Sequence, residues 1–244
     1  MTNKSPKLFL RQNCIIDCTK HWKPGTFLEI GAGTGLMTQM FLSRGFSGYC
    51  YDLSPESRAI LKNRLNEFTA QVKILTNLTI ATNKNFNYLF AFEVLEHIED
   101  DLNALQYWSQ FIQSNGKIIV SVPAHNNKFS KVDELVGHVR RYERDDLFNL
   151  LSKAGYQNIK IINYGYPLTE FSRYISTRLL KNDNSAQLIP IAERNLRSSY
   201  SRPTVISNYL SKIPENIFAP FKYIQRLFYK FYFGDGLVAV AEKI

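Results

Sequence analysis

Three alternating glycines, Gly31, Gly33 and Gly35, directly follow the short, mainly apolar run 27–30. Glycine-rich turns between a strand and a helix let a ligand approach the backbone closely. No lysine follows Gly35, so the GxxxxGK[ST] pattern of a triphosphate loop is absent. The G-x-G-x-G spacing also differs from the G-x-G-x-x-G of dinucleotide-binding folds. We therefore expect a ligand of another kind, and a tight turn without any ligand is the alternative interpretation.

Two acidic residues near this loop in the sequence indicate which kind of ligand it binds. Glu29 stands two residues before the first glycine, where a carboxylate disfavours a pyrophosphate and favours a ligand with an ammonium group. Asp52 follows Gly35 by seventeen residues and ends a predicted strand, where a carboxylate can accept both hydroxyls of a ribose. An unphosphorylated ribose joined to an amino-acid ammonium describes S-adenosylmethionine.

Two further segments carry groups suited to proton transfer. The segment 93–97, EVLEH, ends in His97, and an imidazole pKa of about 6.5 suits a general base. A histidine that only hydrogen-bonds the loop backbone is the alternative. The segment 133–142, DELVGHVRRY, offers His138 as a second base, with His125 as a weaker third.

The same second segment contains Arg140, Arg141 and Tyr142. Arginine can hold a carboxylate or phosphate with two hydrogen bonds, and a tyrosine can orient a hydroxyl. Adjacent arginines face different ways, so we expect one to be structural and the other functional. A solvated pair leading into the helix that begins at Glu143 is the alternative.

Alternating strand-like and helix-like segments must position these groups. The strands are predicted at residues 26–30, 48–53, 72–76, 87–95, 116–123, 158–166 and 237–243. The helices between them are predicted at residues 36–45, 54–68, 100–113 and 143–156. This alternation predicts an α/β fold, with a mainly parallel sheet and helices on both faces.

About 70 residues without a strand-like run separate the last two strands, far more than an ordinary connection. We expect one domain over residues 1–244, with a cofactor-binding core at 24–165, a helical substrate cap at 166–234 and a last strand at 235–244.

The cap carries ten basic and four acidic residues. Within it, Lys222, Arg226 and Lys230 are spaced four apart, which predicts an amphipathic helix whose apolar side covers the core. A surface that meets anionic lipid or a lipid-linked substrate is the alternative.

Four segments in this order, EIGAGTG, YDLS, FEVLEHIEDD and GKIIVSVP, resemble the motifs of class I S-adenosylmethionine-dependent methyltransferases. The resemblance covers about residues 27–164, and residues 236–243 match the usual seventh, antiparallel strand. It extends to a bacterial subset with a D-x-x-x-GH-x-RRY segment. The resemblance implies a Rossmann-like, seven-stranded sheet and S-adenosyl-L-methionine as the cofactor.

The resemblance also implies residue roles. The glycine loop lines the methionine end of the cofactor, Asp52 holds the ribose, and Leu53 packs on the adenine. Asn77 stands where the family often has an aspartate that reads the adenine amino group. The implied cofactor-binding residues are Glu29, Gly31, Ala32, Gly33, Gly35, Asp52, Leu53, Asn77, Phe92 and Glu93. The candidate catalytic residues are Glu93, His97, His138, Arg140, Arg141 and Tyr142.

The segment Glu93-x-x-Glu96-His97 resembles the one with which small-RNA 3′-terminal 2′-O-methyltransferases hold Mg²⁺. The same letters also occur in methyltransferases without a metal. We expect no metal here. A divalent metal ion bound by Glu93, Glu96 and His97 is the alternative.

Composition limits the remaining choices. The chain is 45% hydrophobic with a net charge of +9, and no uninterrupted apolar run reaches the length of about 18 residues expected for a membrane span. Three cysteines are too few for a disulfide framework, which indicates a reduced cytoplasmic protein. Lacking a recognisable RNA-binding module, the chain is not expected to have nucleic acid as a partner.

We therefore expect O-methylation of a small, anionic molecule by in-line attack, with a histidine as general base. Metal-assisted 2′-O-methylation of RNA or ribose, N-methylation of a small molecule, and a non-catalytic cofactor-binding protein are the alternatives. The oligomeric state is left open.

Overall fold

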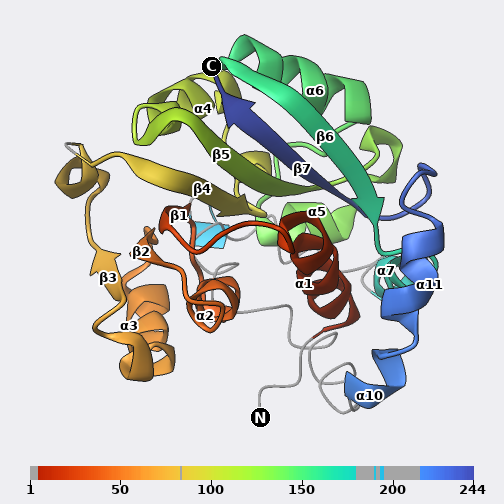
Figure 1. Ribbon diagram of the computed structural model, residues 1–244. Coiled ribbons are helices and arrows are strands. Elements are labelled where there is room, and N and C mark those ends of the chain that lie inside the picture. Colours follow the sequence, from red (N-terminus) through yellow and green to blue (C-terminus); the bar gives the residue numbers. More distant parts are fainter. Residues whose placement is uncertain (1–4, 83, 180–189, 191–192, 195–214) are drawn as a thin grey trace.

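The computed structural model describes residues 5–82, 84–179, 190, 193–194 and 215–244. A seven-stranded sheet in the order β3-β2-β1-β4-β5-β7-β6 runs through them, with helices on both faces (Figure 1). The strands are β1 Thr26–Ile30, β2 Ser47–Tyr51, β3 Val72–Leu75, β4 Phe86–Phe92, β5 Ile112–Pro123, β6 Tyr156–Tyr164 and β7 Gly236–Lys243. β1 to β5 pair in parallel, and β7 pairs antiparallel with both β5 and β6. The predicted fold class is confirmed.

Nine α-helices lie within the described residues: α1 Pro6–Thr19, α2 Leu36–Leu42, α3 Pro55–Arg64, α4 Asp101–Ser109, α5 Lys131–Val136, α6 Arg144–Lys153, α7 Leu168–Leu179, α10 Glu215–Phe218 and α11 Phe221–Leu227. Short 3₁₀ turns are η1 Asn66–Phe68, η2 Leu78–Ala81, η3 Leu95–His97 and η4 Asn126–Lys128. Among these described helices, none is long and apolar enough to cross a membrane.

The central strands are buried on both faces because successive side chains point in opposite directions. Phe27 of β1 and Phe90 of β4 lie in the core on the α2 side of the sheet. The Phe90 ring stacks on the Phe27 ring at a centroid distance of 5.1 Å and on the Phe41 ring of α2 at 4.1 Å. Leu28 and Leu89, the next residues on the same strands, pack into the core on the opposite face. The sheet therefore packs against a hydrophobic core on each of its faces, and these two cores fix the strand that leads into the glycine loop.

Two predicted helices end earlier than expected. The helix predicted at 100–113 ends at Ser109, and β5 already begins at Ile112, which pairs with Phe86 of β4. α11 ends at Leu227, so Lys230 lies outside it, and the Leu227 side chain is 73% exposed.

The buried residue of α11 is the polar Gln225. Its amide nitrogen donates to the Leu10 carbonyl of α1, and its amide oxygen accepts from the Gly165 N–H. Gln225 is buried because it satisfies two backbone groups that would otherwise lack partners. The segment therefore does form a helix, and Phe221 packs against the core while Arg226 is exposed. The helix is shorter than the basic spacing predicts, and its fully buried side chain is polar.

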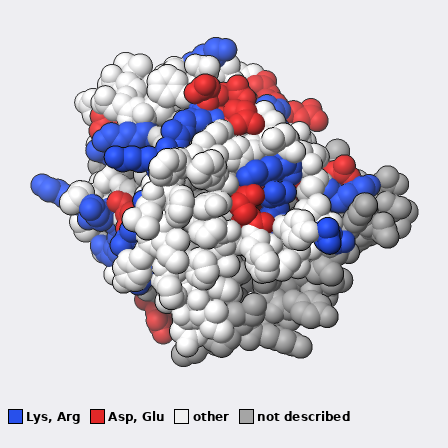
Figure 2. All heavy atoms as spheres, turned by 90° about the vertical axis from the view of Figure 1, so that its right-hand side faces the viewer, with Lys and Arg blue, Asp and Glu red and all other residues white. Residues whose placement is uncertain are grey.

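α1 lies beside α11, although the two helices are near opposite ends of the described chain (Figure 1). The Asp17 carboxylate of α1 pairs with both Nε and Nη2 of Arg226, at 2.8 and 2.6 Å, and accepts from the Tyr229 hydroxyl. On this side of the molecule, lysine and arginine side chains form separate groups, several with acidic side chains beside them (Figure 2). Residues 180–189, 191–192 and 195–214, the middle of the predicted cap, lie outside the described residues.

Candidate active site

The glycine loop connects β1 to α2 at the carboxyl edge of the parallel strands. All three of its glycines have positive φ, at 67° for Gly31, 54° for Gly33 and 78° for Gly35. A Cβ atom on Gly31 would lie 2.5 Å from Cγ2 of Val94, and one on Gly35 would lie 2.5 Å from Cδ1 of Leu61. Both the backbone conformation and the close approach of neighbours therefore require glycine.

Asp52, at the end of β2, is held across this loop. One carboxylate oxygen accepts the Gly33 N–H at 2.8 Å, and the other accepts the Ser54 N–H at 2.9 Å. Burial raises the pKa of Asp52, and these two N–H groups oppose the rise. The Ser57 side chain also makes a hydrogen bond to this carboxylate. A carboxylate has about four acceptor positions, so Asp52 can still accept a hydrogen bond from a ribose hydroxyl.

Glu29 lies beneath the loop and is only 1% exposed. The Thr38 hydroxyl donates to its Oε2 at 2.7 Å. Burial raises the pKa of Glu29 to about 8. Glu29 is therefore mostly neutral at pH 7, which differs from the negative charge expected at this position.

The remaining predicted cofactor residues surround the loop. Leu53 is 71% exposed beside Asp52, while Ala32 and Phe92 are buried. Asn77 caps η2, with its side-chain oxygen accepting the Thr79 N–H at 2.9 Å. An adenine amino group bound by Asn77 would therefore have to share this oxygen with the Thr79 N–H.

Glu93 follows β4 with a left-handed φ of 56°, unusual for a residue other than glycine. Its carboxylate pairs with Lys7 Nζ at 2.9 Å and with Arg11 Nη1 at 3.3 Å, both from α1. Burial favours a raised pKa, but the two cations outweigh it and hold the pKa of Glu93 well below its usual range.

Sequence reasoning missed Lys7 and Arg11. Their spacing of four residues within a helix was the only available signal, because nothing in the sequence relates α1 to Glu93 more than eighty positions away.

The two predicted bases lie together, with the rings of His97 and His138 edge to face at a centroid distance of 4.8 Å. Nδ1 of His97 lies 3.2 Å from the Gly137 carbonyl, and Nδ1 of His138 lies 2.9 Å from Oδ1 of Asp133. Both partners accept hydrogen bonds, so each Nδ1 carries a proton, and a lone pair on either ring is then on Nε2.

Glu96 is fully buried beside this pair, with Nε2 of His138 3.7 Å from its Oε1. Neither of its carboxyl oxygens has a hydrogen-bond partner among the described residues. Burial, followed by the charge of Glu93, raises the pKa of Glu96 well above its usual value.

Glu96, His97 and His138 each offer one ligand atom, and these atoms lie within 4.8 Å of one another. Metal-binding histidines commonly donate the other ring N–H to a carbonyl or carboxylate, as both do here. These three residues therefore fit a divalent cation. Glu93 does not belong to this group, because Lys7 and Arg11 hold its carboxylate, so the fitting set differs from the predicted alternative.

Arg141 is 6% exposed and joins two carboxylates. Its Nε lies 2.9 Å from Asp133, and its Nη1 lies 2.8 Å from Asp235, the residue before β7. Because Asp133 also accepts from His138, Arg141 fixes the carboxylate that orients this histidine.

Arg140 and Tyr142 both bond Asp101 at the start of α4, at 3.0 and 2.7 Å. The Tyr142 ring is buried in the core, so its hydroxyl stabilises the fold locally. His125 packs against Tyr232 at a ring distance of 4.2 Å, apart from the other two histidines. These residues hold the segment between β5 and α6 in place.

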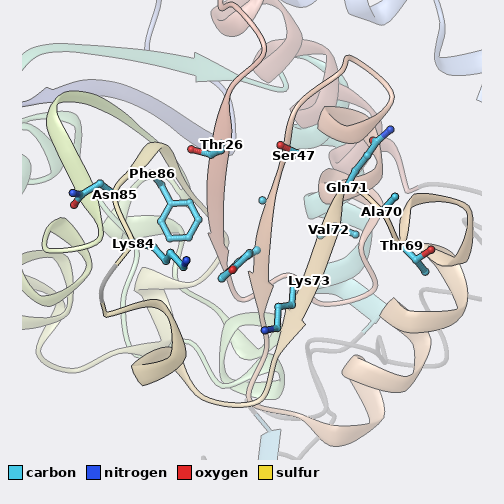
Figure 3. Close-up of a pocket in the computed structure, with 12 residues that line it drawn as sticks. Thr26, Ser47, Thr69, Ala70, Gln71, Val72, Lys73, Lys84, Asn85 and Phe86 are labelled. Atoms are coloured by element: carbon cyan, nitrogen blue, oxygen red, sulfur yellow. The ribbon is translucent and has the colours of Figure 1, made fainter.

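A hollow at the other edge of the sheet is lined by the starts of β1 to β4 (Figure 3). Thr26, Ser47, Val72, Lys73 and Phe86 of the strands contribute to its wall, together with Lys84 just before β4. None of the predicted site residues lines it.

Residues 15–161, more than half of the chain, match the methyltransferase domain family. A curated relative, an uncharacterized methyltransferase of Alkaliphilus oremlandii, is 25% identical over 66% of this chain and 77% of its own length. A ubiquinone biosynthesis O-methyltransferase of Nitrosomonas europaea is 27% identical over 49% of this chain and 52% of its own length, so the match spans about half of that relative.

Solved structures share the fold at low sequence identity. Phosphoethanolamine N-methyltransferase 2 of Haemonchus contortus, in complex with S-adenosyl-L-methionine, has a TM-score of 0.57 at 17% identity, covering 96% of this chain and 52% of that one. The N-methyltransferase NodS of Bradyrhizobium japonicum, in complex with S-adenosyl-L-homocysteine, has a TM-score of 0.57 at 12% identity, covering 96% and 85%.

The glycine loop, the carboxylate held across it and the family match agree: this chain belongs to the class I methyltransferases, whose cofactor is S-adenosyl-L-methionine.

Proposed function

We propose that this methyltransferase methylates an oxygen atom of a small-molecule acceptor, with His138 as the general base. The observation that carries the proposal is the hydrogen bond of 2.9 Å between Nδ1 of His138 and Asp133. This bond leaves Nε2 of His138 as the basic atom, and the carboxylate stabilises the imidazolium that forms when Nε2 takes a proton.

The reaction is an in-line displacement. The acceptor oxygen forms a bond to the methyl carbon as the carbon–sulfur bond breaks, and the sulfonium becomes the neutral thioether of S-adenosylhomocysteine. The hydroxyl proton goes to Nε2 of His138. His97, whose ring lies against that of His138, helps to position the acceptor, and the glycine loop with Asp52 aligns the methyl carbon.

The relatives support both oxygen and nitrogen as acceptors, since one is named an O-methyltransferase and two are named N-methyltransferases. A neutral amine can attack without prior loss of a proton, whereas a hydroxyl benefits from a base. The Asp133–His138 hydrogen bond therefore favours oxygen.

The test combines an acceptor screen with one variant. Phenols, carboxylic acids, phosphomonoesters and amines are offered with methyl-labelled S-adenosylmethionine, and products are identified by mass spectrometry. For a hydroxyl acceptor, His138→Gln is expected to lower kcat by about 10²–10⁴-fold, with unchanged affinity for S-adenosylhomocysteine. Lys20→Gln, at an exposed position after α1, is the control. Unchanged kcat in the His138 variant would exclude this residue as the base.

A second reaction mode, metal-assisted methylation as in 2′-O-methylation of RNA or ribose, is favoured by the Glu96 carboxyl group. Its two oxygens are buried and lack hydrogen-bond partners among the described residues. One carboxyl oxygen lies within 4.8 Å of a ring nitrogen of each histidine. A divalent cation held by Glu96, His97 and His138 would polarise an acceptor hydroxyl.

Calorimetric titration with Mn²⁺ or Mg²⁺ tests this mode without an activity assay, and Glu96→Gln should abolish the binding. Absence of binding to the wild-type protein, or full activity after exhaustive chelation, would remove this mode. For an RNA acceptor, affinity should also fall steeply with added salt.

We also propose that residues 166–234 form a cap over the acceptor side of a single domain. Contacts from α7 support this proposal: Glu170 pairs with Lys128 at 2.8 Å, and Arg173 lies 3.6 Å from Asp235.

The same cap is a candidate for contact with anionic lipid or a lipid-linked substrate. The side chains of Tyr223, Leu227 and Phe231 are 58%, 73% and 52% exposed, and Lys222 Nζ lies over the Tyr223 ring at 4.8 Å from its centroid. Co-sedimentation with anionic but not neutral liposomes would support it, and equal recovery with both would exclude it.

A further inference from the structure

The cations Lys7 and Arg11 lie one helical turn apart on α1 and meet the same carboxylate. Lys7 Nζ is 2.9 Å from one oxygen of Glu93, and Arg11 Nη1 is 3.3 Å from the other. Lys7 also lies 3.8 Å from Asp235. The family match begins at residue 15. Both cations lie before it, in residues 6–14, so the family match does not cover them.

α1 is fixed against the cofactor loop. The Gln12 amide nitrogen donates to the carbonyl of Leu36, the residue that follows Gly35, at 3.2 Å. The charge of Arg11 also acts on Glu29 beneath the loop, where it opposes the rise in the pKa of that carboxyl group. Arg11 therefore lies close to Glu29 in β1 and to Glu93 after β4, at the carboxyl edge of the strands where open α/β sheets bind their ligands.

Arg11 retains a donor that nothing in the described chain accepts. Its Nε–H is buried and has no hydrogen-bond partner there. Its side chain is only 13% exposed. Buried donors without partners are uncommon in folded proteins, and a guanidinium edge matches the two oxygens of a carboxylate.

We propose that Arg11, assisted by Lys7, binds the α-carboxylate of the cofactor's methionine end. That end carries both an ammonium and a carboxylate. Glu93 and the two cations beside it offer the opposite charges, one negative group and two positive ones. The cofactor ammonium pairs with Glu93, and the cofactor carboxylate pairs with the two cations of α1. α1 thereby becomes a wall of the cofactor site, joined to the cap through Asp17 and Arg226.

The experiment compares ligands that differ only in the carboxylate. Calorimetry measures the Kd of S-adenosylhomocysteine and of its decarboxylated analogue, which keeps the thioether, the nucleoside and the ammonium. The proteins are wild type, Arg11→Gln, Lys7→Gln and the control Lys20→Gln, which removes an exposed cation just after α1.

For Arg11→Gln we expect the affinity for S-adenosylhomocysteine to fall about tenfold or more. The affinity for the decarboxylated analogue should change less than about threefold, because that ligand never meets Arg11 through a carboxylate. Lys7→Gln should show the same selectivity with a smaller loss, and Lys20→Gln should match wild type.

Equal losses for both ligands would overturn the proposal, since they would mean general damage to the site. An unchanged affinity of Arg11→Gln for S-adenosylhomocysteine would also overturn it. This holds even if the variant raises the KM of a methyl acceptor. If Arg11→Gln does not fold, Arg11→Lys keeps the charge but loses the planar fork, and it must still weaken S-adenosylhomocysteine selectively. Binding of the analogue to the variant shows that the nucleoside site itself is intact.

Discussion

Glu29→Gln tests whether a buried carboxyl group beneath the glycine loop is protonated near neutral pH. The Glu29 side chain is enclosed, and burial raises its pKa from 4.5 to about 8. Glutamine has nearly the same size and keeps a carbonyl oxygen that can accept the Thr38 hydroxyl, which now donates at 2.7 Å. The change therefore removes the titration and preserves the packing.

The magnitude follows from the difference in pKa between the two states. In the unfolded chain Glu29 loses its proton above pH 4.5, whereas in the folded protein it keeps the proton up to about pH 8. The unfolded state is thus favoured as pH rises, and stability falls by about 1.4 kcal/mol per pH unit between these values before levelling off. From pH 5 to pH 8 this single group costs about 3.5 kcal/mol, and the Glu29→Gln variant does not bear that cost.

Urea denaturation of both proteins at pH 5, 6, 7 and 8 measures the effect. The difference in unfolding free energy, variant minus wild type, should increase by about 3.5 kcal/mol across this range, because the other titrating groups cancel in the comparison. Glu67→Gln, at an exposed glutamate, should show no such trend. Stability curves of wild type and Glu29→Gln that run parallel from pH 5 to pH 8 would refute the assignment of a neutral buried carboxyl.

Three further changes probe packing and the loop. Gly31→Ala places a Cβ 2.5 Å from Val94 at a φ of 67°, so we expect about 1–3 kcal/mol of destabilisation and weaker S-adenosylhomocysteine binding by calorimetry; unaltered binding would contradict the tight fit. Arg141→Gln leaves two buried carboxylates without their shared cation and should cost about 3–5 kcal/mol in urea unfolding, whereas a loss below 1 kcal/mol would show that the pairs are solvated. Phe90→Ala removes the ring that stacks between two core phenylalanines and should cost about 3–5 kcal/mol by thermal or urea unfolding, and a near-neutral effect would mean that the core collapses into the space.

Much of the fold could be predicted because it depends on short-range patterns. Ser54 caps α3 as its position before Pro55 predicts, with its hydroxyl accepting the Ser57 N–H. The end of α4 at Ser109 could not be predicted, because Ile112 pairs with Phe86, a residue 26 positions earlier. The same holds for Gln225, whose burial depends on backbone groups of α1 and of the loop after β6.

The sequence alone determined the strand–helix alternation, the glycine loop and the acidic residue at the end of β2, and with them the cofactor class. These features are local, since glycine spacing and hydrophobic periodicity act over a few residues. Only the tertiary structure decided that Lys7 and Arg11 meet Glu93, that His97 lies against His138, and that Glu29 is neutral at pH 7. These depend on contacts between distant segments and on burial, and the charge of a group follows from its surroundings in the folded chain.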